Sequence, residues 1–377
     1  MQNLYQKYRP QIYSQMVGQD KIIKELSKRL IDNNFSQVIL FEGMSGIGKT
    51  CLSKITAKSI LCQSKNEKGE PCNQCSFCQT VNNENISNYF YEYNASNLNI
   101  EELRQLEDLA SKKTLSNAKA RVFVIDELQE IATNRTQKNI LKLLEKPLKN
   151  IFFILGTMDG SKIDKAIKNR CTLYKLQPLS VPEIVKYLMY ICKEENILLD
   201  TIEKKQIIIS LADTCMGSMR AAISNLERVI YSDLWSIKEL QEELSIISNE
   251  DLNEMVNQLL QGDINLLNNK ITEDLLKRIK FILNLLYKFV NRLELNQWQE
   301  QQISGIKKCN VENIEYTIAQ LNELNKFPYL PSDLIEFEII NIIRENKKRK
   351  TVDNEPKLKS QYIKESEEKP KERQSRR

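Results

Sequence analysis

The stretch from Gly43 to Thr50 reads GMSGIGKT and follows the pattern G-x-x-x-x-G-K-[ST]. The apolar run QVILFE at residues 37–42 precedes it, and a segment of helical character follows from Lys49 to about Leu61. A strand, a glycine-rich loop and a helix in this order form the context in which such a loop binds phosphate. The stretch therefore predicts a nucleotide-triphosphate site, against the alternative of a glycine-rich turn that binds nothing.

The chemistry of this loop follows from its glycines, its lysine and its threonine. Glycines let backbone N–H groups turn inward around phosphate oxygens, and the helix N-terminus adds a partial positive charge. In such loops the lysine reaches the β- and γ-phosphates and the hydroxyl coordinates Mg²⁺, so we expect ATP and Mg²⁺ as cofactors. The residues assigned to this nucleotide site are Gly43, Ser45, Gly46, Ile47, Gly48, Lys49, Thr50 and Cys51, with Lys49 also assigned a catalytic role.

Apolar runs alternate with helical segments on either side of the loop. Further strands are expected at residues 88–93, 121–125 and 151–155, and helices at 100–111 and 136–144. Residues 1–36 are expected to form a short lead and an amphipathic helix, with Ile22, Ile23, Leu26 and Leu30 at helical spacing. Strands that alternate with helices imply a parallel sheet covered on both faces. The fold class expected from this pattern is therefore α/β, a parallel sheet carrying the phosphate-binding loop.

After Pro178 the strands stop and amphipathic helices follow at residues 182–196, 202–211 and 218–231. This change predicts four parts of the chain. They are a nucleotide-binding domain at 1–178 with a cysteine-rich module at 62–78, a helical lid at 179–245, a third helical domain at 250–344, and a disordered basic tail at 346–377.

Two carboxylates, Asp126 and Glu127, end the β-rich run RVFVI. Buried strands seldom end in charged groups, because charge is costly near a core. Beside a phosphate-binding loop, Asp126 would complete the Mg²⁺ shell together with Thr50, and Glu127 would act as the general base that polarises the attacking water. The alternative is a solvated turn after a strand.

Four of the nine cysteines, Cys62, Cys72, Cys75 and Cys78, crowd into a short stretch. Four thiolates at this spacing predict a tetrahedral Zn²⁺ site, which would be structural because every ligand position is filled. Reduced, unliganded cysteines and an iron–sulfur cluster are the alternatives. The chain has no histidine, which excludes His-based catalysis and His metal ligands.

Composition and charge bear on whether the chain is a membrane, secreted or DNA-binding protein. No run of eighteen apolar residues occurs and the N-terminus lacks the apolar core of a signal peptide, so a cytoplasmic protein without a membrane partner is expected. The net charge of +5 is concentrated after Asn346. DNA contacts in the rest of the chain would therefore come from local Lys/Arg patches.

Taken together, these motifs resemble the gamma/tau subunits of the bacterial DNA polymerase III clamp loader, a family of AAA+ ATPases. The resemblance covers about residues 4–240. It implies that the third domain, 250–344, is a helical collar for oligomerisation, where the match is limited to Leu334-Ile335-Glu336. Its motifs, in order, are Tyr8-Arg9-Pro10, Val17-Gly18-Gln19, the phosphate loop, the cysteine cluster, Asn94-Ala95-Ser96, Asp126-Glu127, Leu143-Leu144-Glu145-Lys146-Pro147 and Asn169-Arg170-Cys171.

The resemblance implies roles for residues whose function the sequence pattern alone does not indicate. Tyr8, Arg9, Pro10, Val17 and Gly18 would lie on the adenine side of the site. Thr157 would be the first sensor of the γ-phosphate, and Arg220 the second sensor, contacting ATP from the helical lid. Arg170 would be a catalytic finger inserted into a neighbouring subunit's site.

Four positions depart from the family's pattern. Asn169 stands where Ser is usual, Gln129 where His is frequent, Met158 where Thr is common, and Ala221 where Asp is usual. The departures imply slower hydrolysis with nucleotide binding retained. The chain also lacks the long extension of tau-type subunits, so it is expected to be gamma-like.

The function implied is that of an ATP-hydrolysing subunit that opens a sliding clamp and loads it onto primed DNA. Its partners would be other loader subunits in a hetero-pentamer, the clamp and primer–template DNA. The family is grouped with the DNA-directed DNA polymerases, which are nucleotidyltransferases, yet no polymerase activity is expected of this chain.

Two alternatives stay open. Another AAA+ DNA-processing motor, such as a branch-migration or helicase-loading ATPase, leaves the four cysteines unexplained. A non-hydrolysing scaffold subunit of the loader is disfavoured because Lys49, Thr50, Asp126 and Glu127 are all present.

Overall fold

The computed structural model describes residues 3–83, 87–98, 100–112, 118–131, 134–145, 147–236, 249–263, 273–293, 295, 300, 302–306, 311–324 and 332–350. The chain forms two compact units that meet in sequence between Ile246 and Ile247. The first contains the sheet and the lid helices, and the second contains only helices among its described residues.

The first unit is built on a parallel sheet with the strand order β2-β3-β4-β1-β5. Its strands are β1 (Val38–Glu42), β2 (Phe90–Asn94), β3 (Arg121–Asp126), β4 (Ile151–Thr157) and β5 (Thr172–Lys175). Because the strands are parallel, their carboxyl ends share one edge. The phosphate loop, Asp126 and Thr157 therefore lie at the same edge of the sheet, and the predicted α/β class is confirmed.

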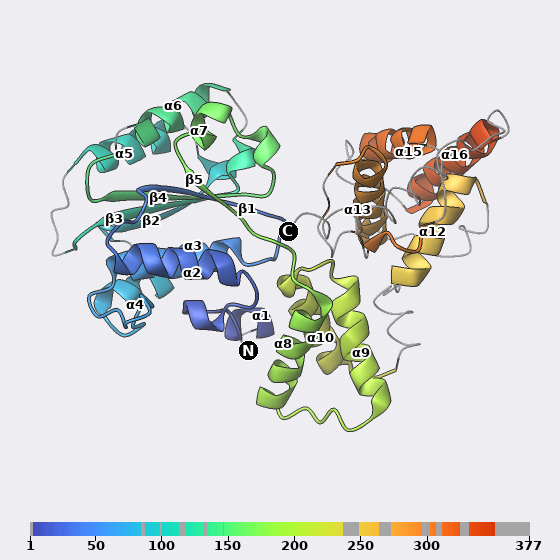
Figure 1. Cartoon of the computed structure of the whole chain (residues 1–377), viewed down its shortest axis with the longest axis horizontal. Helices are drawn as coiled ribbons and strands as arrows, with labels where there is room; N and C mark the ends of the chain where they lie inside the picture. Colours follow the sequence, from blue (N-terminus) through green and yellow to red (C-terminus); the bar gives the residue numbers. More distant parts are fainter. Residues whose placement is uncertain are drawn as a thin grey trace, which may run out of the picture. The chain divides into compact units, whose positions relative to one another are not determined.

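Helices cover both faces of this sheet (Figure 1). On one face lie α2 (Asp20–Ile31), α3 (Lys49–Leu61) and α4 (Ser76–Asn83), and on the other lie α5 (Ile100–Ser111), α6 (Asn134–Glu145) and α7 (Lys165–Lys168). Ile39 and Phe41 pack into the first layer, whereas Leu40 packs into the second. Burial on both sides explains why β1 is apolar from Val38 to Phe41.

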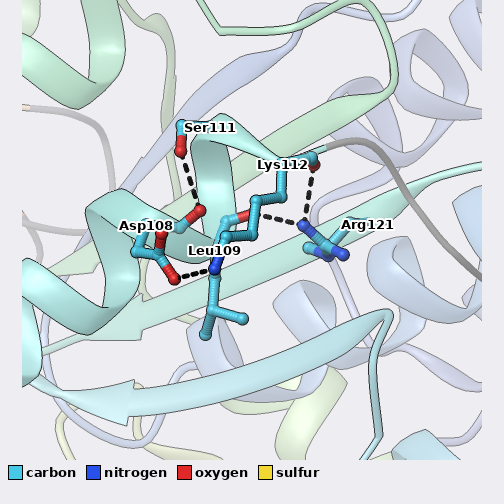
Figure 2. A network of polar contacts seen from close by, with 5 residues as sticks. All are labelled: Asp108, Leu109, Ser111, Lys112 and Arg121. Carbon is cyan, nitrogen blue, oxygen red and sulfur yellow. Dashed lines mark hydrogen bonds and ion pairs between the residues drawn. The ribbon is translucent and has the colours of Figure 1, made fainter.

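At the amino end of β3, Arg121 fastens helix α5 to the sheet (Figure 2). Its side chain is 4% exposed. Its Nε donates to the carbonyl of Asn88 at 2.9 Å, and its Nη1 donates to the carbonyls of Leu109 and Lys112. The last carbonyls of a helix have no partner within the helix and carry partial negative charge. The buried Arg121 guanidinium donates hydrogen bonds to two of these carbonyls and places a positive charge beside their partial negative charge.

Three lid helices follow the sheet: α8 (Val181–Glu194), α9 (Ile202–Thr214) and α10 (Met219–Ser232). The prediction of three helices here is confirmed. Ser180 and Glu183 form a capping box that starts α8, which satisfies two otherwise free backbone donors. The short helix α1 (Leu4–Lys7) joins the lid, where the backbone N–H of Leu4 donates to Glu227 Oε1 at 2.8 Å. Short 3-10 turns complete the unit: η1 (Tyr13–Gln15), η2 (Ala95–Asn97), η3 (Leu128–Glu130) and η4 (Gly160–Lys162).

The described helices of the second unit are α12 (Asn249–Gln261), α13 (Glu273–Val290), α15 (Val311–Leu324) and α16 (Ser332–Lys350). They share one apolar core. The predicted start of the disordered tail at Asn346 is wrong, because α16 continues to Lys350 and Asn346 is fully buried. The Asn346 amide donates to the Leu259 carbonyl and to Thr317 Oγ1, both at 3.0 Å.

The remainder of the predicted tail, residues 351–377, lies outside the described residues, as does the predicted end of the lid at 237–245. Across the described ranges, no helix combines the length and the apolar composition that a bilayer crossing requires.

Candidate functional site

The phosphate loop leaves the carboxyl end of β1 and enters α3 through a tight turn. Gly46 and Gly48 have φ of 77° and 107°, values that side chains other than glycine adopt only with strain. A Cβ on Gly43 would lie 2.4 Å from Ile47 Cδ1, and one on Gly46 would lie 2.0 Å from Ser218 Oγ. The loop conformation thus needs its glycines, and it presents the positively polarised end of α3.

Lys49 is buried at the centre of this loop. Its side chain is 5% exposed, and its Nζ donates to the Met44 carbonyl at 3.0 Å. Burial lowers the pKa of Lys49, while the nearby carboxylates of Glu127 and Asp126 act to raise it. A cation held here, close to two anionic groups, is suited to receive a phosphate oxygen.

Thr50 and Asp126 bring two oxygens together beside the lysine. Thr50 Oγ1 donates to Asp126 Oδ2 at 2.6 Å, and Asp126 Oδ1 accepts from the Glu127 N–H at 2.9 Å. Neighbouring ligands of an octahedral Mg²⁺ ion with bonds of about 2.05 Å lie about 2.9 Å apart. The pair therefore fits adjacent positions around such an ion with only a small adjustment.

Glu127 and Thr157 are connected through one side chain. Glu127 has a left-handed backbone with φ of 55°. The Nε2 of Gln129, in η3, donates to Glu127 Oε2. The Oε1 of Gln129 accepts from Thr157 Oγ1 at 2.8 Å and from the Met158 N–H at 2.9 Å. The sequence predicted Glu127 and Thr157 as site residues but identified Gln129 only as a departure from the family's pattern.

These groups border an open pocket of about 690 Å³, its solvent-facing mouth included. Most of the residues assigned to the nucleotide site line it: Tyr8, Arg9, Pro10, Val17, Ser45, Gly46, Ile47, Gly48, Lys49, Thr50, Cys51, Glu127 and Arg220. Sequence reasoning missed six further lining residues: Tyr5, Met16, Leu179, Tyr187, Met219 and Ile223. Several of these are neighbours of predicted residues on the same helix or segment, which is the signal that could have identified them.

The lid reaches the phosphate loop through the start of α10. The backbone N–H of Arg220 donates to the Gly46 carbonyl at 3.3 Å. Its guanidinium donates to the hydroxyl of Tyr5 at 3.1 Å and lies 5.0 Å from the centre of the Tyr5 ring. Arg220 is thus placed over the loop, with its charge at the edge of the pocket.

Other predicted residues lie outside the pocket lining. Asp126 is hydrogen-bonded to Thr50, which lines the pocket. Thr157 is hydrogen-bonded to Gln129, which in turn contacts the pocket residue Glu127. Gly43 lies under Ile47, and a Cβ on Gly18 would lie 2.7 Å from Leu179 Cδ2. These two glycines shape the packing around the pocket.

Arg170 lies away from this pocket. Its Nη2 pairs with Glu145 Oε1 at 2.9 Å, and its Nη1 donates to the Ala166 carbonyl at 2.9 Å. The side chain is about one third exposed. Arg170 therefore does not line its own chain's site, and its guanidinium is engaged by Glu145 and the Ala166 carbonyl.

The four clustered cysteines converge as predicted. The sulfurs of Cys62, Cys72, Cys75 and Cys78 lie within 4.8 Å of one another, and the Cys75 and Cys62 sulfurs are 4.0 Å apart. Four thiolates around Zn²⁺ at about 2.3 Å would lie about 3.8 Å apart. The arrangement thus fits a closed tetrahedral metal site.

Local backbone groups support this arrangement. The N–H groups of Cys75 and Gln74 donate to Cys72 Sγ at 3.3 and 3.5 Å. Partial burial acts to raise the pKa of Cys72, yet these N–H groups, together with the side chains of Cys62 and Cys75, lower it to about 6. Such donors favour the thiolate, which is the form that binds metal.

Lys58 ties the cysteine turn to the phosphate-binding core. It is 1% exposed, and its Nζ donates to the side-chain oxygens of Gln11 at 2.8 Å, Asn73 at 2.7 Å and Asn82 at 2.8 Å. Burial lowers the pKa of Lys58 to about 8. Because Cys62 caps the C-terminus of α3, the helix that begins at the phosphate loop ends at the cysteine cluster.

Comparison with known proteins finds similarity to subunits of DNA polymerase III. A family model described as DNA polymerase III, delta subunit, matches residues 18–180. The chain is 34% identical to the DNA polymerase III subunit tau of Bacillus subtilis over 61% of this chain and 39% of the relative. It is 32% identical to the gamma subunit of Buchnera aphidicola from Acyrthosiphon pisum, over 61% of this chain and 62% of the relative.

A gamma subunit from the Buchnera of Baizongia pistaciae is 29% identical over 86% of both chains. Among solved structures, the Thermotoga maritima RuvB Holliday junction branch migration motor is similar, at 14% identity and a TM-score of 0.49, over 82% of this chain and 98% of RuvB. The chain spans less than two thirds of the length of the first two relatives. Over 61–86% of its length, the chain is thus similar to gamma and tau subunits of DNA polymerase III.

Proposed function

We propose that this chain is an ATP-hydrolysing subunit of a sliding-clamp loader, which opens a ring-shaped clamp and loads it onto primed DNA. The observation that carries the proposal is the contact of 2.6 Å between Thr50 and Asp126, beside buried Lys49 and with Glu127 in the same pocket. These are the groups that cleavage of a Mg-nucleotide requires, and a non-hydrolysing scaffold would not need to keep them together.

In the proposed reaction the loop and Lys49 would bind the phosphates. Thr50 and Asp126 would hold Mg²⁺, which would supply positive charge to stabilise the reacting phosphate groups. Glu127 accepts a proton from a water whose oxygen attacks the γ-phosphorus. The bond to the β–γ bridging oxygen breaks, and ADP and phosphate are the products. Arg220 would contact the nucleotide from the lid. Thr157 is fully buried, and it would sense the γ-phosphate through Gln129 and Glu127.

ATP at the boundary between two subunits would favour the assembled state that grips an open clamp. Primer–template DNA would be held through its phosphates by Lys and Arg side chains and helix N-termini, without sequence readout. The finger Arg170 of a neighbouring subunit would complete each site. Each step requires that ATP binds one state more tightly than the other.

The test is ATP turnover by the full chain assembled with its other loader subunits. Stimulation by the clamp and primed DNA would support the proposal. Stimulation by Holliday junctions instead would favour a branch-migration motor, and absence of hydrolysis in every mixed complex would favour a scaffold subunit.

Lys49→Ala is expected to weaken binding of MgATP by roughly 10- to 100-fold, because a charge-assisted hydrogen bond contributes about 1.5–3 kcal/mol. Titration with a fluorescent ATP analogue measures the affinity. Lys54→Ala is the matched control, since Lys54 lies on the same helix and pairs with Glu92 at 2.9 Å. Equal affinities for the Lys49 variant and the wild type would contradict phosphate binding at this loop.

We also propose that the four cysteines hold a structural Zn²⁺ ion. Cys75→Ser is expected to remove about one equivalent of zinc and to lower the melting temperature of the first unit by roughly 4–8 °C, as a loss of about 2 kcal/mol implies for 150–250 residues. Metal analysis and calorimetry measure the two effects. Cys171→Ser is the control, because its sulfur donates to the Ile167 carbonyl at 3.1 Å, a bond that serine retains. Full zinc content in the Cys75 variant would contradict the site.

A further inference from the structure

Gln129 links the two side chains at the carboxyl ends of β3 and β4 that the proposed function uses. It is 8% exposed and lies in η3, directly after Glu127 and Leu128. Its amide contacts Glu127 on one side and Thr157 on the other. A polar side chain this deeply buried is stable only because each end has a partner.

The orientation of this amide is fixed by its surroundings. Gln129 Oε1 accepts from the Met158 N–H at 2.9 Å, and a backbone N–H cannot act as an acceptor. Rotating the amide by 180° would place an NH₂ group against that N–H and lose both acceptor bonds. The NH₂ group must therefore face Glu127, where it donates to Oε2.

This arrangement restricts the Glu127 carboxylate. One of its two oxygens is held by Gln129, while the residue's left-handed backbone directs it from the strand end to the pocket. Thr157 is fully buried, and its hydroxyl, which lies 2.8 Å from Gln129 Oε1, also lies 3.2 Å from the Asp159 carbonyl. The base and the γ-phosphate sensor are thereby held at a set spacing.

We propose that Gln129 is a positioning residue, which acts through both ends of its amide to align the Glu127 carboxylate with the Thr157 hydroxyl. The inference rests on the proposed ATP hydrolysis. It assigns a function to a residue whose role a histidine could also fill, since a neutral imidazole ring likewise offers one donor and one acceptor. The water-activating carboxylate and the Thr157 hydroxyl then move as one unit.

The test compares three variants of the full chain, each assembled with its loader subunits, clamp and primed DNA. Gln129→Ala is expected to lower kcat by roughly 10- to 100-fold, the loss typical of a displacement of about 1 Å at a reacting group. Its KM for ATP is expected to stay within about threefold of the wild type, because Gln129 does not line the nucleotide pocket. Gln129→Glu keeps the length but loses the donor, and a similar loss is expected.

Gln129→His supplies the rescue, and its kcat is expected to return to within roughly fivefold of the wild type, since an imidazole restores a donor and an acceptor. Thermal unfolding and ATP-analogue binding confirm that each variant is folded, and the Glu and His variants retain bulk if the alanine variant unfolds. Wild-type kcat in the Glu variant, or a His variant as slow as the Ala variant, would overturn the inference. Absence of turnover in the wild type would instead refute the proposed function, and the inference with it.

Discussion

Replacing Arg170 by alanine is expected to slow ATP turnover of the assembled complex by roughly 10³- to 10⁵-fold, the range measured for guanidinium fingers on transferring phosphoryl groups. ATP affinity is expected to stay unchanged, because Arg170 does not line its own chain's pocket. Single-turnover hydrolysis and analogue binding on the same complex measure the two quantities. Their separation would show that the arginine acts on the reaction and not on nucleotide capture.

Mixing two variants tests whether Arg170 acts on a neighbouring subunit. A Lys49→Ala chain keeps its finger, and an Arg170→Ala chain keeps its phosphate loop, so their mixture is expected to recover part of the turnover that each lacks alone. Glu145→Gln is the control, since it removes the ion pair of 2.9 Å while leaving the finger in place. Parallel loss of affinity and turnover in the Arg170 variant, without recovery on mixing, would contradict an action in trans.

Glu127→Gln is expected to lower kcat by roughly 10²- to 10⁴-fold, because an amide cannot accept the proton of the attacking water. The substitution preserves the shape of the side chain, and the new amide oxygen can still accept from Gln129 Nε2. ATP should therefore bind normally and remain uncleaved. The fraction of bound radiolabelled ATP that stays intact over time measures the effect.

Glu130→Gln is the matched control for this change. Glu130 belongs to the same 3-10 turn but is exposed, so its variant is expected to turn over ATP as the wild type does. Less than a tenfold loss in the Glu127 variant would assign the general base to another group.

The parallel sheet, and the phosphate-binding site at the carboxyl ends of its strands, could be predicted because short local sequence patterns encode them. β1 is buried on both faces and is therefore apolar from Val38 to Phe41, and a phosphate loop requires glycine where the backbone has positive φ. The hydrogen bond between Thr50 and Asp126 could be expected because the strands that precede them are parallel, so that their carboxyl ends share one edge of the sheet. The predicted helix from Lys49 to Leu61 coincides with α3.

Other features depend on contacts that no local pattern encodes. Strand β5 was missed because it lies at the sheet edge, and Tyr174 is the one buried residue of its four. The extension of α16 was missed because its last turns are rich in charge, although Asn346 is buried between α12 and α15. Gln129 and Lys58 were missed because their partners come from other segments of the chain.

Helix α3 connects the phosphate loop to Cys62 in a single rigid element, and its thirteen residues span about 20 Å at 1.5 Å per residue. A paramagnetic ion such as Co²⁺, which accepts the same tetrahedral sulfur ligands, would therefore stand at a known separation from any nucleotide in the pocket. Its effect on the phosphorus resonances of that nucleotide falls steeply with distance. With Co²⁺ bound by the four cysteines, the phosphorus resonances of a bound nucleotide would report movements at the nucleotide pocket in solution, without an attached label.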